Sequence, residues 1–163
     1  TTTIVTERVD DIPLLLTHIM KMGIPDLLDA HFPTHNNWDG LSLGWTAAIW
    51  LTHILSQADH RLNKVQEWVV KHIQTIEGIT GLSIRALDFN NDRLAIILRY
   101  LNQDESWQEY EVAQGKHLIR AYNLSTDLVR LDATTASSFK DPSKSGIFQL
   151  GLSQRSPSRF GSS

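Results

Sequence analysis

The stretch "LSLGWTAAIWLTHILSQ", residues 41–57, constrains the fold of this chain more than any other feature. It is apolar nearly all round, and it is too long for a typical β-strand. A helix without a polar face has to be covered by other parts of the protein. The sequence therefore predicts a central buried helix from about Ser42 to Gln57.

Helix start and stop signals surround this segment. Asp10 or Asp11 is placed to begin a helix that Gly23 ends, and Asn90 and Asp104 are placed to begin two later helices. The stretch "FPTHNNWDG" is instead rich in residues that form loops. The predicted helices cover residues 10–23, 24–32, 42–57, 63–76, 90–102 and 104–122.

The pattern changes after Asn123. The runs "LVRL" and "GIFQLGL" are short and β-prone, and the turn-like "KDPSKSG" lies between them. They predict a β-hairpin, which needs further strands because a lone hairpin is only marginally stable. The expected fold class is mainly α, with a helical domain at 1–125, a hairpin fragment at 126–152 and a Ser-rich, disordered tail at 153–163.

Composition and charge exclude several function classes. There is no cysteine, which excludes disulfides and thiolate chemistry. No apolar run is long enough for a membrane span and no segment marks export, so we expect a cytoplasmic protein without membrane contact. The net charge of −3 is unlike that of a free-standing nucleic-acid binder. From Arg130 onward five basic residues face two acidic ones, whereas the preceding part has ten basic and sixteen acidic residues, a net charge of −6.

Asp132 is the residue with the strongest chemical signal. It closes a short apolar run and is followed by the small and hydroxyl residues of "ATTAS". A carboxylate at the end of a strand is well placed to bind a divalent cation, because Mg²⁺ prefers oxygen ligands. The alternative is an Asx-turn or a cap for the residues that follow.

The histidines suggest a second kind of metal site. His31 and His35 are four apart, and His53 and His60 are seven apart. Zinc sites need three or four ligands at recognisable spacings, and neither pair supplies them. Ordinary core or surface histidines are the favoured interpretation.

The stretch "SQADHRLNKVQEW" joins two predicted helices by a short turn, as in a helix-turn-helix. Arg61, Asn63 and Lys64 are then candidates for DNA contact, although Glu67 and apolar positions share their helix. Trp38, in the loop before the central helix, is a candidate for stacking on a base. Simple helix packing is the favoured interpretation of the helix pair.

Three parts of the sequence are informative when taken together: the long helical stretch from "ERVDDIPLLLTHIMKMG" to "NKVQEW", then "RALDFNNDRLAIILRYL", and finally "VRLDATTAS" with "GIFQLG". Together they resemble the N-terminal half of bacterial insertion-sequence transposases of the DDE type. The resemblance runs from about Glu7 to Ser153. It implies a helical domain followed by a ribonuclease H-like α/β catalytic domain that acts on transposon-end DNA. It also implies that Asp132 is the first of three catalytic carboxylates that hold Mg²⁺ or Mn²⁺.

The sequence departs from this family at its C-terminal end. Relatives continue with a motif such as "GHSKDHRPDL" and two further carboxylates, whereas this chain has "GLSQRSPSRFG" and ends at Ser163. The tail can be encoded by a set of codons in which deleting the one nucleotide after the Ser153 codon shifts the reading frame. The shifted frame then encodes "SKDHRPDL". The sequence thus predicts a truncated or frameshifted transposase fragment that is inactive alone, since one carboxylate cannot hold two metal ions.

Two alternatives to the inactive fragment remain open. The helical part can be a binding module that contacts transposon-end DNA, another copy of itself or a full-length transposase subunit, without catalysis. The acidic balance of that part favours a protein partner, because like charge repels phosphate. The plainest alternative is a relic that folds in its helical part and has no function.

Overall fold

A computed structural model describes Ile4 and residues 6–127 of the chain, and all of the described helices belong to the unit Thr1–Asp127. The described part is helical and contains no β-strand. The predicted hairpin at 126–152 and the tail at 153–163 lie almost wholly outside the described residues. The helices are α1 (Ile12–Lys21), α2 (Ile24–His31), α3 (Leu43–Gln57), α4 (Leu62–Lys71), α5 (Ile73–Thr80), the short 3₁₀ helix η1 (Ala86–Phe89), α6 (Asn91–Leu101) and α7 (Asp104–Tyr122).

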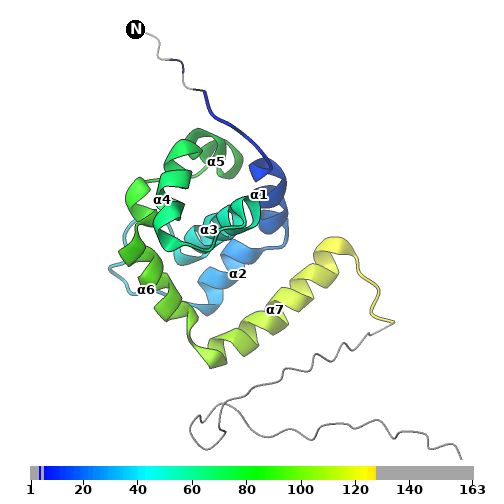
Figure 1. Cartoon of the computed structure of the whole chain (residues 1–163). Coiled ribbons are helices and arrows are strands. Elements are labelled where there is room, and N and C mark those ends of the chain that lie inside the picture. Colours follow the sequence, from blue (N-terminus) through cyan, green and yellow to red (C-terminus); the bar gives the residue numbers. More distant parts are fainter. Residues whose placement is uncertain (1–3, 5, 128–163) are drawn as a thin grey trace, which may run out of the picture. The chain divides into compact units, whose positions relative to one another are not determined.

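The predicted central helix is confirmed as α3. It packs against α1 and α2 on one side and against α4 and η1 on the other, and Figure 1 shows it in the middle of these elements. Ser42 begins the helix as predicted, with its hydroxyl oxygen accepting a hydrogen bond from the amide of Trp45 at 3.3 Å. The helix ends at Gln57, where Ala58 adopts a left-handed conformation.

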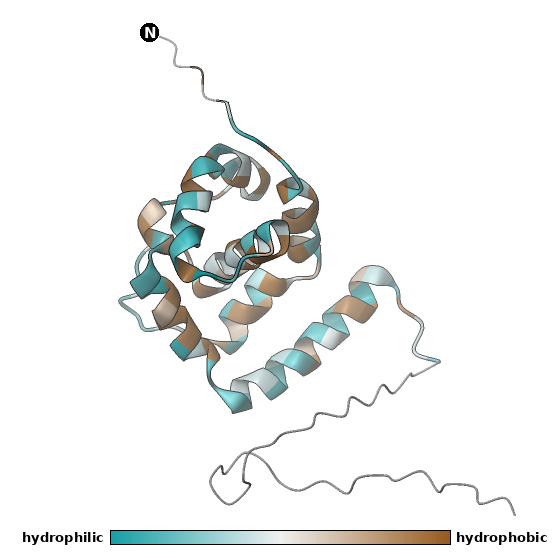
Figure 2. Ribbon diagram, viewed as in Figure 1, coloured by the Kyte–Doolittle hydropathy of each residue, from teal (hydrophilic) through white to brown (hydrophobic). Residues whose placement is uncertain are grey.

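The core is made of apolar side chains from every helix except α7. Aliphatic residues at helical spacing on α1, α4 and α6 are buried in it, together with Phe32 and Phe89. Figure 2 shows these apolar segments gathered around α3, whereas α7 is mainly hydrophilic. The fully buried large residues are Phe32, Phe89, Ile12, Leu16, Leu43, Ile49, Ile76, Leu94, Ile97, His53, Val65 and Val69.

Most predicted helix ends are confirmed. Gly23 ends α1 in a left-handed conformation, with φ of 71°. Asn90 caps α6 by accepting a hydrogen bond from the amide of Arg93 at 2.7 Å. Asp104 is the first helical residue of α7, and Gln103 occupies the cap position instead. Asp11 begins α1 without capping it, because its carboxylate accepts a hydrogen bond from the hydroxyl of Ser56 at 2.5 Å.

The prediction of one continuous helix over 63–76 is wrong. The chain bends at His72, where φ is −124° and ψ is 17°, so that two helices form. In a continuous helix the amide of His72 would bond to the carbonyl of Trp68. Here the imidazole Nδ1 of His72 occupies that carbonyl at 2.7 Å, and the amide bonds to the carbonyl of Val69 at 3.0 Å.

None of the described helices combines the length and the hydrophobicity that crossing a bilayer requires.

Candidate functional site

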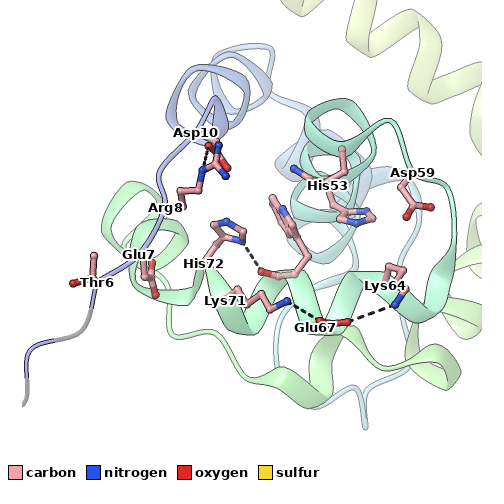
Figure 3. A pocket seen from close by; sticks show the side chains of 12 residues that line it. Thr6, Glu7, Arg8, Asp10, His53, Asp59, Lys64, Glu67, Lys71 and His72 are labelled. Carbon is pink, nitrogen blue, oxygen red and sulfur yellow. Dashed lines mark hydrogen bonds and ion pairs between the residues drawn. The ribbon is translucent and has the colours of Figure 1, made fainter.

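A polar cavity of about 550 Å³ lies between the N-terminal segment, the end of α3 and one face of α4. Figure 3 shows its side chains, which come from segments far apart in the sequence. The aromatic rings of His53, Trp68 and His72 contribute to its wall, and charged side chains from the N-terminal segment and α4 surround them. The lining residues are Thr6, Glu7, Arg8, Asp10, His53, Gln57, Asp59, Lys64, Glu67, Trp68, Lys71 and His72.

Trp68 lies between the two histidines. The ring centroid of His53 is 5.2 Å from that of Trp68 in an edge-on arrangement, and the His72 centroid is 5.0 Å away with the rings tilted by 41°. The imidazole of His72 donates through Nδ1 to the carbonyl of Trp68, because a carbonyl oxygen can only accept. These contacts hold all three rings in place. Because His72 is also the cap residue between α4 and α5, the bend between these helices lies at the wall of the cavity.

His53 is a core histidine, as the sequence favoured. Its side chain is almost fully buried, and burial lowers its pKa, with the charge of Asp59 acting weakly in the opposite direction. Its Nδ1 atom and the indole N–H of Trp68 are buried without a hydrogen-bond partner among the described residues. The neutral imidazole is therefore the stable form of His53 near neutral pH.

Glu7 closes the cavity on the side of the N-terminal segment. Its carboxylate accepts hydrogen bonds from the amides of Gln74 at 2.9 Å and Thr75 at 2.8 Å, and from the hydroxyl of Thr75 at 2.9 Å. These amides belong to the first turn of α5, whose own cap residue His72 makes no capping bond through its side chain. Partial burial acts to raise the pKa of Glu7, but the bonds from Gln74 and Thr75 outweigh it and lower the pKa.

The predicted DNA contacts Arg61, Asn63 and Lys64 lie together at the start of α4 and are exposed. The two cations among them have carboxylate partners. Arg61 forms an ion pair of 2.7 Å with Asp59, which lowers the pKa of that carboxyl group through hydrogen bonds. Lys64 lies 3.7 Å from Glu67. The local positive charge that a phosphate would require is therefore largely neutralised.

The other basic residues of the cavity are paired as well. Lys71 lies 2.6 Å from Glu67, and Arg8 lies 2.9 Å from Asp10. Hydrogen bonding to Lys71 lowers the pKa of Glu67, so this carboxylate stays ionised. The cavity thus has a mixed and internally compensated charge. Such a site suits neutral polar groups or a protein surface better than a phosphate.

Trp38 does not join the other candidate DNA residues but packs against α6. Its indole N–H donates to the carbonyl of Leu41 at 2.9 Å, and its ring lies edge-on to Tyr100 with the centroids 5.8 Å apart. The guanidinium of Arg93 covers one face of the ring at 3.6 Å from the centroid. A base could stack on that face only if Arg93 moved.

Asp132, the predicted catalytic and metal-binding residue, lies outside the described residues. Within Ile4 and residues 6–127 there is no group of three or more His, Asp or Glu side chains that could hold a metal ion.

Comparisons with protein-family models, with curated proteins and with solved structures find no match to this chain. The resemblance to insertion-sequence transposases therefore stays a prediction from the sequence.

Proposed function

We propose that this chain is part of an insertion-sequence transposase of the DDE type, with a helical domain that precedes a metal-dependent catalytic segment. The resemblance from Glu7 to Ser153 supports the proposal. The observation that supports it further is the order of elements: helices are the only regular elements of the described residues through α7, and the β-prone run that carries Asp132 begins only after Asp127. This is the order that the resemblance implies. A cytoplasmic location belongs to the same proposal, because the substrate would be bacterial DNA.

The chemistry of such an enzyme sets what this polypeptide can do alone. Two divalent ions about 4 Å apart activate the attacking oxygen and stabilise the leaving oxygen during strand cleavage and transfer. Several carboxylates must converge to hold them. Asp132 would supply one of these, with Mg²⁺ or Mn²⁺ as the metal. Strand transfer is therefore expected to need further carboxylates besides Asp132.

The test begins with the nucleotide sequence beyond the Ser153 codon. The proposal expects codons for "KDHRPDL" in a shifted frame, followed by further acidic codons, and a shifted frame without them contradicts it. The protein made from the restored frame should cleave transposon ends in the presence of Mn²⁺. Asp132→Ala should abolish this cleavage, whereas Asp127→Ala, which removes an exposed carboxylate nearby, should not.

A second candidate is a helical binding module without catalysis. The pairing of Arg61 with Asp59 and of Lys64 and Lys71 with Glu67 favours a protein partner over DNA. Gel-shift titration against terminal inverted repeats at several salt concentrations separates the two partners. A shift that weakens steeply with salt would indicate DNA, since phosphate contacts release counterions. The absence of a shift at micromolar protein would favour a partner subunit.

A further inference from the structure

Helix α7 is held to the rest of the described domain along one side only. The ring of Trp107 packs edge-on against Phe32 with the centroids 4.9 Å apart. Further along, the side-chain amide of Gln114 donates to the carbonyl of Met22 at 2.6 Å, and the imidazole of His117 lies 3.1 Å from the carbonyl of Lys21. No residue of α7 is buried, although every other described α-helix buries at least one.

A second side of α7, next to the one that packs on the domain, carries a stripe of exposed residues. Their spacing of three and four residues places them on the same face of the helix. Val112 and Ile119 supply its apolar part and are 58% and 41% exposed. Glu109, Val112, Lys116 and Arg120 of this stripe line a hollow of about 780 Å³ between α2 and α7. The stripe consists of Glu105, Glu109, Val112, Lys116, Ile119 and Arg120.

Charges of opposite sign are segregated along this helix. All four acidic residues of α7 lie between Asp104 and Glu111, and both of its Lys and Arg residues lie at 116 and 120. The helix dipole favours acids at the start and bases at the end, but its effect falls off within the first and last turns. Glu109 and Lys116 lie in the middle of the helix, so the dipole does not account for them.

The segregation is unfavourable within one helix. Glu105 and Glu109 are four residues apart, and so are Lys116 and Arg120, and like charges at this spacing destabilise a helix. Glu109 is 79% exposed in its side chain, and the imidazole of His31 lies 3.8 Å from its carboxylate. A binding partner with the reverse order of charges would convert both repulsions into attractions.

A second copy of α7 that runs in the opposite direction presents its charges in this reverse order. Glu109 lies three residues before Val112, and Lys116 lies three residues after Ala113. Glu105 and Arg120 lie seven residues before and after the same two positions. A two-fold axis between Val112 and Ala113 would therefore place each glutamate opposite a cation of the second copy, around an apolar centre.

We propose that the stripe on α7 is a docking surface for a second copy of this chain, which pairs with it antiparallel about that axis. Isologous pairing of one surface with itself is the commonest form of protein dimer. DNA would be repelled by the acidic half of the stripe. Because a single pair of helices buries less area than a standard stable interface, the dimer is expected to be weak and reversible. The inference needs only α7 and does not depend on the proposed transposase function.

Charge reversal tests the pairing in the complete chain. Sedimentation equilibrium from low to high micromolar protein at low salt should show a mass that rises from 18.4 kDa toward twice that value. Glu109→Lys, or Lys116→Glu, should weaken association by about tenfold or more, because each reversal creates two like-charge contacts across the two-fold axis. The double variant should restore it. Glu111→Lys makes the same change away from the stripe and should have little effect.

Cross-linking tests the direction and register independently, since the chain has no native cysteine. Val112→Cys should form a disulfide-linked dimer on mild oxidation. Gln108→Cys should not form one. In the antiparallel pair the two cysteines at position 108 would be nine residues apart, or about 13 Å along the helix axis, and a disulfide cannot span that distance. Circular dichroism confirms that each variant remains folded.

Several outcomes would overturn the proposal. One is a wild-type chain that stays monomeric without cross-linking, as expected if a downstream segment or another protein covers the stripe. Another is a dimer that the single reversals leave unchanged or that the double variant fails to restore. Equal cross-linking at positions 108 and 112 would indicate parallel pairing. None of these results tests whether DNA cleavage depends on Asp132. The dimer proposal and the transposase proposal can therefore fail independently.

Discussion

The backbone amide of Gly44 donates a hydrogen bond to the Oδ1 atom of Asp29 at 2.6 Å. The other carboxylate oxygen accepts from the hydroxyl of Ser42, also at 2.6 Å. Asp29 belongs to α2, whereas both donors lie at the start of α3. The carboxylate thus satisfies an amide that the first turn of a helix would otherwise leave unpaired, and it joins α2 to the central helix.

Gly44→Ala should strongly destabilise the protein. A Cβ atom at this position would lie 2.0 Å from the carbonyl oxygen of Pro25 and 2.9 Å from the carboxylate of Asp29. Because backbone cannot move aside as a flexible side chain can, α2 and α3 would have to separate, at a cost of about 3 kcal/mol or more. Urea unfolding measures the change. Gly78→Ala in α5 is the control: its Cβ would meet nothing within 4 Å, so unchanged or slightly higher stability is expected there.

Asp29→Ala should lower the free energy of unfolding by about 1–3 kcal/mol, since it leaves the amide of Gly44 and the hydroxyl of Ser42 without their acceptor. The measurement is urea unfolding at neutral pH. Asp26→Ala removes an exposed carboxylate from the first turn of the same helix and should cost clearly less. Equal effects of the two substitutions would show that the link between α2 and α3 contributes little.

Glu7→Ala should destabilise the protein by about 1–2 kcal/mol at pH 7, the range of a lost helix cap. The folded state lowers the pKa of Glu7, so its stabilising effect is complete above the usual value of 4.5 and is lost as the pH falls through the folded pKa. The difference between wild type and variant should therefore shrink in acid. Unfolding curves at several pH values measure it, with Glu111→Ala as the control. A difference that does not change with pH would exclude the charged cap.

His53 should make the protein sensitive to mild acid. Burial lowers its pKa, so the unfolded state takes up a proton first as the pH falls. The free energy of unfolding should be constant above about pH 6.5 and should fall below it, until the folded pKa is reached. This window lies above the range in which Glu7 and Glu67 titrate.

The variant His53→Leu tests this directly. It removes the titrating group but keeps an apolar side chain beside Trp68, so its stability should change much less between pH 7 and pH 5 than that of the wild type. His60→Gln, which replaces an exposed imidazole, should keep the acid sensitivity. Unfolding in urea across this pH range supplies the measurement, and equal slopes in wild type and His53→Leu would contradict the role of His53.

The candidate DNA residues illustrate what a pattern in one chain can and cannot predict. Arg61, Asn63 and Lys64 are exposed at the start of α4, and their contact with DNA stays a prediction. Their pairing with Asp59 and Glu67 depends on side-chain positions across the turn and along α4. Trp38 was expected to be available for stacking, but the loop that carries it folds back so that Arg93 covers its ring. The burial of His53 against Trp68 also follows from the packing of α3 on α4.

The sequence by itself determined where most helices begin and end. Caps such as Ser42 and Asn90, the left-handed Gly23 and the apolar stretch of α3 act between residues within one or two turns, so their effect can be read locally. The bend at His72 also rests on local bonds, to Trp68 and Val69, but the helical spacing of the apolar residues did not indicate it. Only the tertiary structure decided the cap that Glu7 provides to α5, 67 residues away. The physical reason is that these bonds form between groups that only the packed chain brings together. Their geometry depends on the whole core rather than on neighbouring residues.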